Sequence, residues 1–306
     1  MIYPTDIILL LSLAVIVSIF AFFIYIIRTA RPLDIPIVVA SFCIIISVVF
    51  FLYATQVETH TINIKHTNIN LNDLDKPIKI AFISDIHVGV TDPDVIRAAV
   101  EAINAENPDI ILLGGDFVDS NENEIAQLSI LENLSAKNGV YAVLGNHDYL
   151  MYTNSGCPSE RGNALAENIS AKLEAMGFIV LRDESIPISN SIVLVGLEDY
   201  WSCKSDYLSA SKSVGNYKTN ILLTHNQDAV PKDQLTEWDL VLFGHTHCGQ
   251  VRLPILGSVP KFLGFHGEYD MGHYELDNHS HLYATCGLMG VARFLAFPEV
   301  SIIEIS

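Results

Sequence analysis

Five short apolar segments of this chain each end in side chains that can bind a metal ion, and this arrangement constrains the fold more than any other feature. The segments are residues 78–83, 110–113, 140–144, 220–223 and 240–243. Amphipathic helical patterns at residues 93–107 and 124–137 lie between the first three segments. Strands that alternate with helices are typical of an α/β fold with a central sheet. Because ligands of open α/β sheets bind beyond the carboxyl ends of the strands, we expect the polar residues that follow these segments to meet.

The second half of the chain contains more strand patterns than helical ones. One helix is expected at residues 163–176, with Gly177 as its C-cap. The further strands are expected at residues 178–181, 186–188, 192–195, 269–276, 281–285 and 300–305. No linker divides residues 78–306, so the sequence predicts one large domain.

The residues that follow the five segments are aspartate, asparagine and histidine. They are Asp85, His87, Asp116, Asn146, His147, Asp148, His225, His245 and His247. Each alone has an ordinary explanation, because aspartate caps turns, an Asn-His step belongs to turn chemistry, and a histidine can be a hydrogen-bonded core residue. These explanations would have to coincide at five strand ends. The pattern therefore favours a metal site.

The ligand set indicates two ions and hydrolysis at phosphorus. Seven of these residues, namely two aspartates, one asparagine and four histidines, are counted as ligands. Seven ligands exceed the needs of one four-coordinate zinc, but they suit two divalent ions (Mn, Fe or Zn) that share a bridging carboxylate. Such a pair clamps a phosphoryl group and activates water. The Gly-x-Ser-x-Gly elbow of serine hydrolases and the glycine loops of nucleotide-binding folds do not occur in the sequence.

The motifs follow one another in a fixed order. They are Asp85-x-His87, Gly115-Asp116, Gly145-Asn146-His147-Asp148, His225 and Gly244-His245-x-His247. This order, within residues 78–306, resembles the calcineurin-like metallophosphoesterases. Residues 196–199 and 247–254 are similar to a membrane-associated bacterial branch of that family. The branch includes phospholipid-handling phosphodiesterases and a UDP-2,3-diacylglucosamine diphosphatase of the lipid A pathway.

The resemblance implies a four-layer α-β-β-α sandwich and a role for each motif residue. His147 would be the non-ligand histidine that stabilises the transition state or protonates the leaving oxygen, and Asp148 would orient it. Asp116 would bridge both ions. The remaining ligands would divide into Asp85, His87 and His247 for the first ion, and Asn146, His225 and His245 for the second.

Two charge-free apolar runs precede the domain, at residues 7–27 and 37–54. Each approaches the roughly 20 residues that cross a membrane as a helix. A cleavable signal peptide fits poorly, because no basic region precedes the first run. We therefore expect residues 1–55 to form two transmembrane helices of a multi-pass cell-membrane protein, residues 56–77 a tether or edge strand, and residues 78–306 the metallophosphoesterase domain.

The charges between the two runs bear on the orientation of the domain. Arg28 and Arg31 lie in the short connector, which the positive-inside tendency places in the cytoplasm. The domain would then face outward. A cytoplasmic lipid A precursor as substrate would require the opposite orientation.

The net charge of −18 argues against a nucleic-acid partner, because such proteins carry a basic surface. The expected partners are the membrane and a phosphoester or pyrophosphate substrate. A lipid-linked substrate is one option. No protein partner is evident from the sequence. Two alternatives stay open: a non-catalytic metal-binding sensor or scaffold at the membrane, and a phosphoprotein phosphatase.

Several residues outside the motifs have two interpretations each. Cys157, Cys203, Cys248 and Cys286 either pair or stay free. Cys248, beside His247, either influences metal choice and redox sensitivity or is a small buried filler. Residues 149–162 form either a substrate-facing flap or a surface loop. Arg293 either contacts substrate phosphate or is an ordinary surface arginine.

Overall fold

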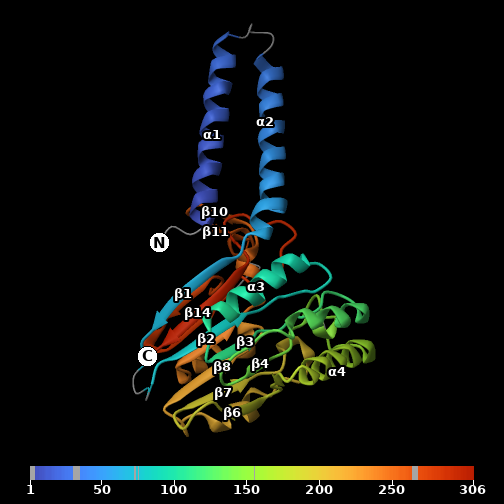
Figure 1. Cartoon of the computed structure of the whole chain (residues 1–306), viewed down its shortest axis with the longest axis vertical. Coiled ribbons are helices and arrows are strands. Elements are labelled where there is room, and N and C mark those ends of the chain that lie inside the picture. Colours follow the sequence, from blue (N-terminus) through green and yellow to red (C-terminus); the bar gives the residue numbers. More distant parts are fainter. Residues whose placement is uncertain (1–3, 30–34, 72–73, 75, 155, 264–267) are drawn as a thin grey trace.

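The computed structural model describes residues 4–29, 35–71, 74, 76–154, 156–263 and 268–306. Two long helices, α1 (Pro4–Thr29) and α2 (Ile35–Leu52), run side by side and project from a domain of two sheets (Figure 1). The domain is a mixed α/β structure in which most neighbouring strands are parallel.

The first sheet has the strand order β1-β14-β2-β3-β4-β5. Its parallel run from β2 to β5 consists mainly of buried apolar residues, as expected for strands covered on both faces. Two helices, α3 (Pro93–Glu106) and α4 (Glu160–Ala175), bury apolar faces in the same cluster as β2 and β3. The strands are β1 (Asn63–Ile69), β2 (Ile78–Ile83), β3 (Ile110–Leu113), β4 (Val140–Ala142), β5 (Ile179–Val180) and β14 (Glu299–Ile305).

The second sheet has the order β12-β13-β9-β8-β7-β6. The inner strands β13, β9, β8 and β7 are parallel, and the edge strands β12 and β6 are antiparallel to their neighbours. Side chains of both sheets, among them Phe82, Leu112, Leu194 and Leu223, share one buried cluster. The strands are β6 (Glu184–Pro187), β7 (Ile192–Gly196), β8 (Thr219–Leu223), β9 (Leu240–Phe243), β12 (Gly272–Glu275) and β13 (His281–Ala284).

Shorter elements lie outside the two main sheets, among them a helix, a hairpin and a further helix. Helix α5 (Tyr207–Ala210) packs on the second sheet. A two-stranded hairpin joins β10 (Arg252–Leu253) to β11 (Gly257–Ser258), and α6 (Val259–Phe262) follows it directly. The hairpin lies at the foot of the two long helices (Figure 1).

Most predicted elements are present, with differences at their ends. The expected α-helix at residues 124–137 is instead a 3₁₀ helix, Glu122–Leu131. The start of this helix is fixed because the Glu124 carboxylate accepts hydrogen bonds from the backbone N–H groups of Asp119 and Ser120. Helix α4 begins earlier than predicted because Ser159 caps it, accepting a hydrogen bond from Gly162 N–H.

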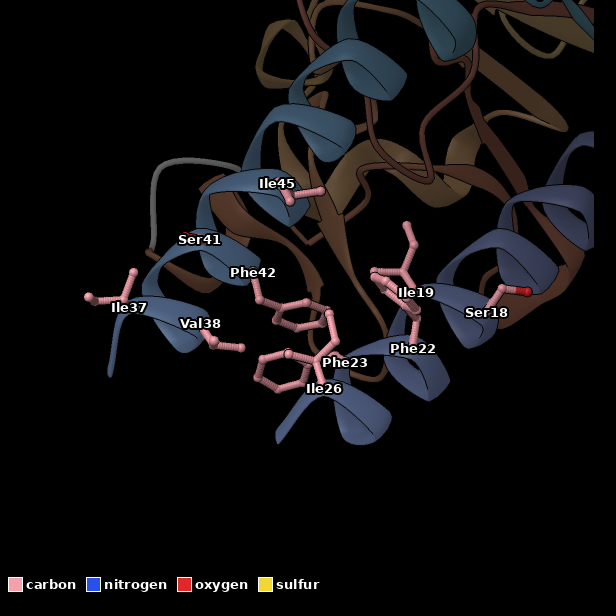
Figure 2. Close-up of a pocket in the computed structure, with 10 residues that line it drawn as sticks. All are labelled: Ser18, Ile19, Phe22, Phe23, Ile26, Ile37, Val38, Ser41, Phe42 and Ile45. Carbon is pink, nitrogen blue, oxygen red and sulfur yellow. The ribbon is translucent and has the colours of Figure 1, made fainter. Parts of the chain in front are cut away.

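Among the described residues, one helical segment, Ile35–His60, is long and apolar enough to cross a membrane, and Val17–Thr29 is a shorter apolar stretch. Residues 30–34 of the charged connector between the two apolar runs lie outside the described residues. Figure 2 shows an apolar groove of about 490 Å³ between α1 and α2, where the rings of Phe23 and Phe42 stack 3.8 Å apart. Its lining consists of apolar residues and two serines and holds no titratable side chain.

Candidate metal centre

The seven predicted ligands meet at the carboxyl ends of β2, β3, β4, β8 and β9. Five of them have a left-handed backbone, which non-glycine residues adopt at a cost of about 1–3 kcal/mol each. Such strain clusters at functional sites, where the surrounding structure holds it in place. The strained residues, with φ between 43° and 63°, are Asp85, His87, Asp116, His245 and His247.

A first group of side chains consists of Asp85, His87, Asp116 and His247, whose ligand atoms lie within 4.8 Å of one another. His247 Nε2 is 3.3 Å from Asp85 Oδ1, and His87 Nε2 is 3.4 Å from Asp116 Oδ2. Both ring nitrogens of His87 are buried and lack a hydrogen-bond partner. An unsatisfied buried imidazole beside two carboxylates fits a bound cation.

A second group surrounds His225 Nε2. This nitrogen lies 3.1 Å from Asn146 Oδ1, 3.2 Å from His245 Nδ1 and 3.3 Å from Asp116 Oδ2. Two imidazole nitrogens that face each other need a proton or a cation between them. In a tetrahedral site with bonds of about 2.1 Å, neighbouring ligand atoms are about 3.4 Å apart, so the spacing of the second group suits a metal ion.

Asp116 belongs to both groups, because its Oδ2 contacts His87 on one side and His225 on the other. Burial would raise the pKa of Asp116, but His225 and His87 hold that pKa well below its usual range. Burial also acts to lower the pKa values of His87 and His225, and the contacts with Asp116 outweigh it and raise both to about 10. Without a metal ion, the buried carboxylates thus draw protons onto these two histidines.

Two backbone carbonyls orient the ligand histidines. His225 Nδ1 lies 2.8 Å from Gly114 O, and His247 Nδ1 lies 3.1 Å from Met289 O. Each Nδ1–H donates to its carbonyl, so Nε2 of both rings points into the cluster and offers its lone pair there once that nitrogen carries no proton. This outer hydrogen bond is the usual companion of a metal-bound histidine.

His147 lies beside the first group, but a different aspartate from the predicted one accompanies it. Its Nδ1 donates to Asp119 O at 2.9 Å, and the Asp119 carboxylate is 3.8 Å away. Asp148 instead accepts hydrogen bonds from the backbone N–H groups of Phe117 and Gly145. The predicted contact between Asp148 and His147 is therefore wrong, because the Asp148 carboxylate is used to hold two ligand loops together.

The environment of Asp148 reflects this structural role. Burial and the nearby Asp116 raise the pKa of Asp148 to about 7, while its hydrogen bonds from backbone N–H groups act to lower it. Asp119, which the sequence reasoning missed, also lies 3.6 Å from His87 Nδ1 through its carboxylate. Its signal in the sequence was an aspartate three residues after Asp116 in the same strand-end loop.

Two aromatic side chains flank the cluster and were also missed. The Tyr152 ring packs edge-on against His147 with centroids 4.9 Å apart, and the Trp201 ring packs edge-on against His245 at 5.0 Å. Tyr152 belongs to the segment 149–162. A disulfide between Cys157 and Cys203 ties this segment to the loop that carries Trp201.

Cys248 is buried, as one of its two interpretations expected, whereas Arg293 fits neither of its two interpretations. Cys248 is buried and forms a disulfide with Cys286, so it offers no free thiol to a metal ion. Arg293 is fully buried and donates to the carbonyls of Cys286 and Ala296. It is neither a surface arginine nor a phosphate ligand, because backbone carbonyls take up its guanidinium.

Comparisons with known proteins agree with this geometry. The family model for the calcineurin-like phosphoesterases matches residues 78–249. Two uncharacterized metallophosphoesterases of Helicobacter pylori are 30% and 32% identical over 254 residues, which cover 79% of this chain and 63% of each relative. The chain thus spans about 63% of the length of these two relatives.

Other relatives are matched over more of their length. The phosphodiesterase YaeI of Escherichia coli is 29% identical, with 79% of this chain and 87% of the relative covered. An uncharacterized metallophosphoesterase of Aquifex aeolicus is 31% identical, with 82% of this chain and 94% of the relative covered. The chain belongs to the calcineurin-like phosphoesterase family of metal-dependent hydrolases.

Proposed function

We propose that this protein is a membrane-anchored phosphodiesterase or diphosphatase that hydrolyses P–O bonds with two divalent ions. The observation that carries the proposal is the pair of ligand groups joined at Asp116 Oδ2, which contacts a histidine of each group at 3.3–3.4 Å. Asp85, His87 and His247 would hold one ion, and Asn146, His225 and His245 the other. Residues 78–306 would form the catalytic domain.

The chain's own residues would bind the ions and supply a proton. Two bound ions activate water and neutralise the charge that develops on a phosphoryl group. His147 has its Nδ1–H held by Asp119 O, so in its imidazolium form the ring would pass the Nε2 proton to the leaving oxygen and become neutral imidazole. Asp119 would thus be the residue that positions His147. A metal sensor or scaffold has no need of such a histidine.

A four-layer α-β-β-α sandwich is the finer architecture that we propose. The buried cluster shared by the two sheets supports it, because this cluster contains strand residues of both. A second cluster joins α3 and α4 to the first sheet, and a third joins α5 and Trp238 to the second sheet. The inner cluster would place the two sheets face to face, with helical segments on their outer sides.

We also propose two transmembrane helices, α1 and α2, with the catalytic domain outside the cytoplasm. The two arginines of the connector support this orientation. The two disulfides, Cys157–Cys203 and Cys248–Cys286, support it independently, because such bonds persist mainly in oxidising compartments. A reporter fused to the carboxyl terminus is expected to be active outside the cytoplasm. A reporter active only in the cytoplasm would reverse the orientation and bring back cytoplasmic lipid precursors as substrates.

The catalytic proposal is tested with the full chain in detergent and bis-p-nitrophenyl phosphate as substrate. We expect hydrolysis with Mn²⁺, loss of hydrolysis with EDTA, and recovery when metal is restored. The variant Asp116→Asn is expected to lose both activity and bound metal. A native chain that binds metal but hydrolyses nothing with any divalent ion would favour the sensor or scaffold. A native chain that hydrolyses phosphoprotein but no diester would favour the phosphoprotein phosphatase.

A further inference from the structure

We infer that the β10–β11 hairpin and α6 form a second membrane contact, which seats the metal centre on the surface of a lipid bilayer. The site would then act on phosphoesters whose apolar part stays in the membrane. This inference rests on the proposal that α2 crosses the bilayer, and it names the substrate class of the proposed metal centre.

The hairpin and α6 expose an unusual series of large apolar side chains. Phe262 in α6 is 65% exposed, and Leu263 just after it is 58% exposed. Lys261 is the one lysine between residues 252 and 263. It forms an ion pair with Asp270 and donates a hydrogen bond to Glu268 O. We call this set the docking surface: Leu253, Ile255, Leu256, Phe262 and Leu263.

Ile255 at the tip of the hairpin is the most informative of these residues. It is fully exposed and has a left-handed backbone with φ of 74°. A β-branched residue is a marked outlier in this conformation, which glycine and asparagine adopt far more readily. The turn therefore holds an apolar side chain outward at a conformational cost. A lipid environment removes the cost of exposing that side chain to water.

Hydrogen bonds place the docking surface at the foot of α2. The backbone N–H of Arg252 in β10 donates to Phe294 O at 2.9 Å. The Phe294 ring lies 4.8 Å from the Phe50 ring of α2, and Arg293 N–H donates to Ala54 O at 2.9 Å. If α2 crosses the bilayer, its final turns lie at the lipid interface, and the hairpin lies beside them at the same level (Figure 1).

The same elements connect the docking surface to the metal centre. β10 begins five residues after His247, and Met289 O accepts the hydrogen bond from His247 Nδ1. A cavity of about 310 Å³ lies between the foot of α2, at Thr55, and the loops at Thr91 and Val291. The backbone N–H of Thr91 donates to His87 O at 3.0 Å, so this cavity lies beside a ligand loop. We therefore expect a lipid-borne phosphoester to approach the ions from the side that faces the membrane.

The docking surface would bind a lipid bilayer through apolar contacts. The chain carries a net charge of −18, so an attraction to anionic lipid does not explain the surface. We expect insertion into neutral phosphatidylcholine, with little dependence on salt concentration.

The first test locates the hairpin tip by fluorescence. The full chain with Ile255→Trp is placed in phosphatidylcholine nanodiscs, with or without bromine on the acyl chains. The control is Leu208→Trp, which is 72% exposed in α5, an element that packs against β6 at the far end of the domain (Figure 1). Brominated lipid is expected to quench the added emission at position 255 but not at 208. Equal, unquenched emission from both variants would refute the inference.

The second test separates the docking surface from the metal centre. Hexadecyl p-nitrophenyl phosphate in the nanodisc and bis-p-nitrophenyl phosphate in water give the same chromogenic product. The double variant Ile255→Asp/Leu256→Asp is expected to lose at least about tenfold in kcat/KM on the lipid substrate, from the apolar contact of two side chains. Its activity on the soluble substrate should match that of Leu208→Asp.

The outcomes for the two proposals are distinct. Equal loss on both substrates, or no loss on the lipid substrate, would refute the docking role. A native chain that hydrolyses neither substrate with metal bound would refute the proposed activity. In that case the quenching result still decides whether the hairpin enters the membrane, because it requires neither metal nor turnover.

Discussion

Gly145→Ala is expected to damage the metal centre without removing a ligand. A Cβ at this position would lie 2.2 Å from Asp116 Oδ1 and 2.5 Å from the backbone nitrogen of Asp116. Ordinary contact begins at 3.4 Å, so Asp116 must move by about 0.9 Å at its backbone nitrogen and by about 1.2 Å at its carboxylate oxygen. Gly145 itself is outside the left-handed region, and alanine adds no backbone strain. The full effect therefore falls on the position of Asp116, which contacts both ligand groups.

The magnitude follows from this displacement. A misplacement of about 1 Å in a catalytic constellation costs about 100-fold in rate, so we expect kcat/KM for bis-p-nitrophenyl phosphate to fall by about that factor. Bound metal, measured by mass spectrometry after gel filtration, should fall as well. Both measurements use the full chain in detergent with the same Mn²⁺ supply.

A matched control separates this effect from lost stability. Gly177 has φ of 84° and would place an added Cβ in open space. Gly177→Ala is therefore expected to cost about 1 kcal/mol of stability through its backbone and to keep native activity and metal content. A Gly145→Ala variant with native kcat/KM and native metal content would show that the position of Asp116 does not control the centre.

Three further outcomes follow from the same geometry. His147→Gln should lower kcat by about 100-fold and leave metal content unchanged; lost metal would make His147 a ligand instead. Arg293→Met should lower the free energy of unfolding by about 3 kcal/mol in chemical denaturation, because buried carbonyls lose their donor, and an unchanged value would contradict this burial. Protons on His87 and His225, whose pKa values are raised to about 10 without metal, compete with the ions. Calorimetry in two buffers should therefore show proton release on Mn²⁺ binding and weaker binding as the pH falls; binding without proton release would contradict it.

The strands and the convergence of the motif residues could be predicted because their signals are local. Each of the five apolar segments contains its own strand, and parallel neighbours bring their carboxyl ends to one edge. The position of a side chain at the end of such a strand therefore follows from the sequence alone. This holds for Asp85, Asp116 and His225 without any knowledge of the loops between them.

The contacts of the loops could not be predicted, because they depend on how distant segments meet. Asp119, and not the predicted Asp148, lies beside His147. This outcome depends on the course of two strand-end loops. The burial of Arg293 depends on carbonyls that surround it only in the folded chain. The disulfides join residues 46 and 38 positions apart, and spacing alone favoured no pairing.

The division of the ligands between two ions is the central claim, and metal content tests it most directly. Native chain, His245→Ala, His247→Ala and the double variant are compared by mass spectrometry. If each histidine serves a different ion, the native chain binds two ions, each single variant binds one, and the double variant binds none. If both histidines serve the same ion, the double variant keeps one ion, and the proposed division is wrong.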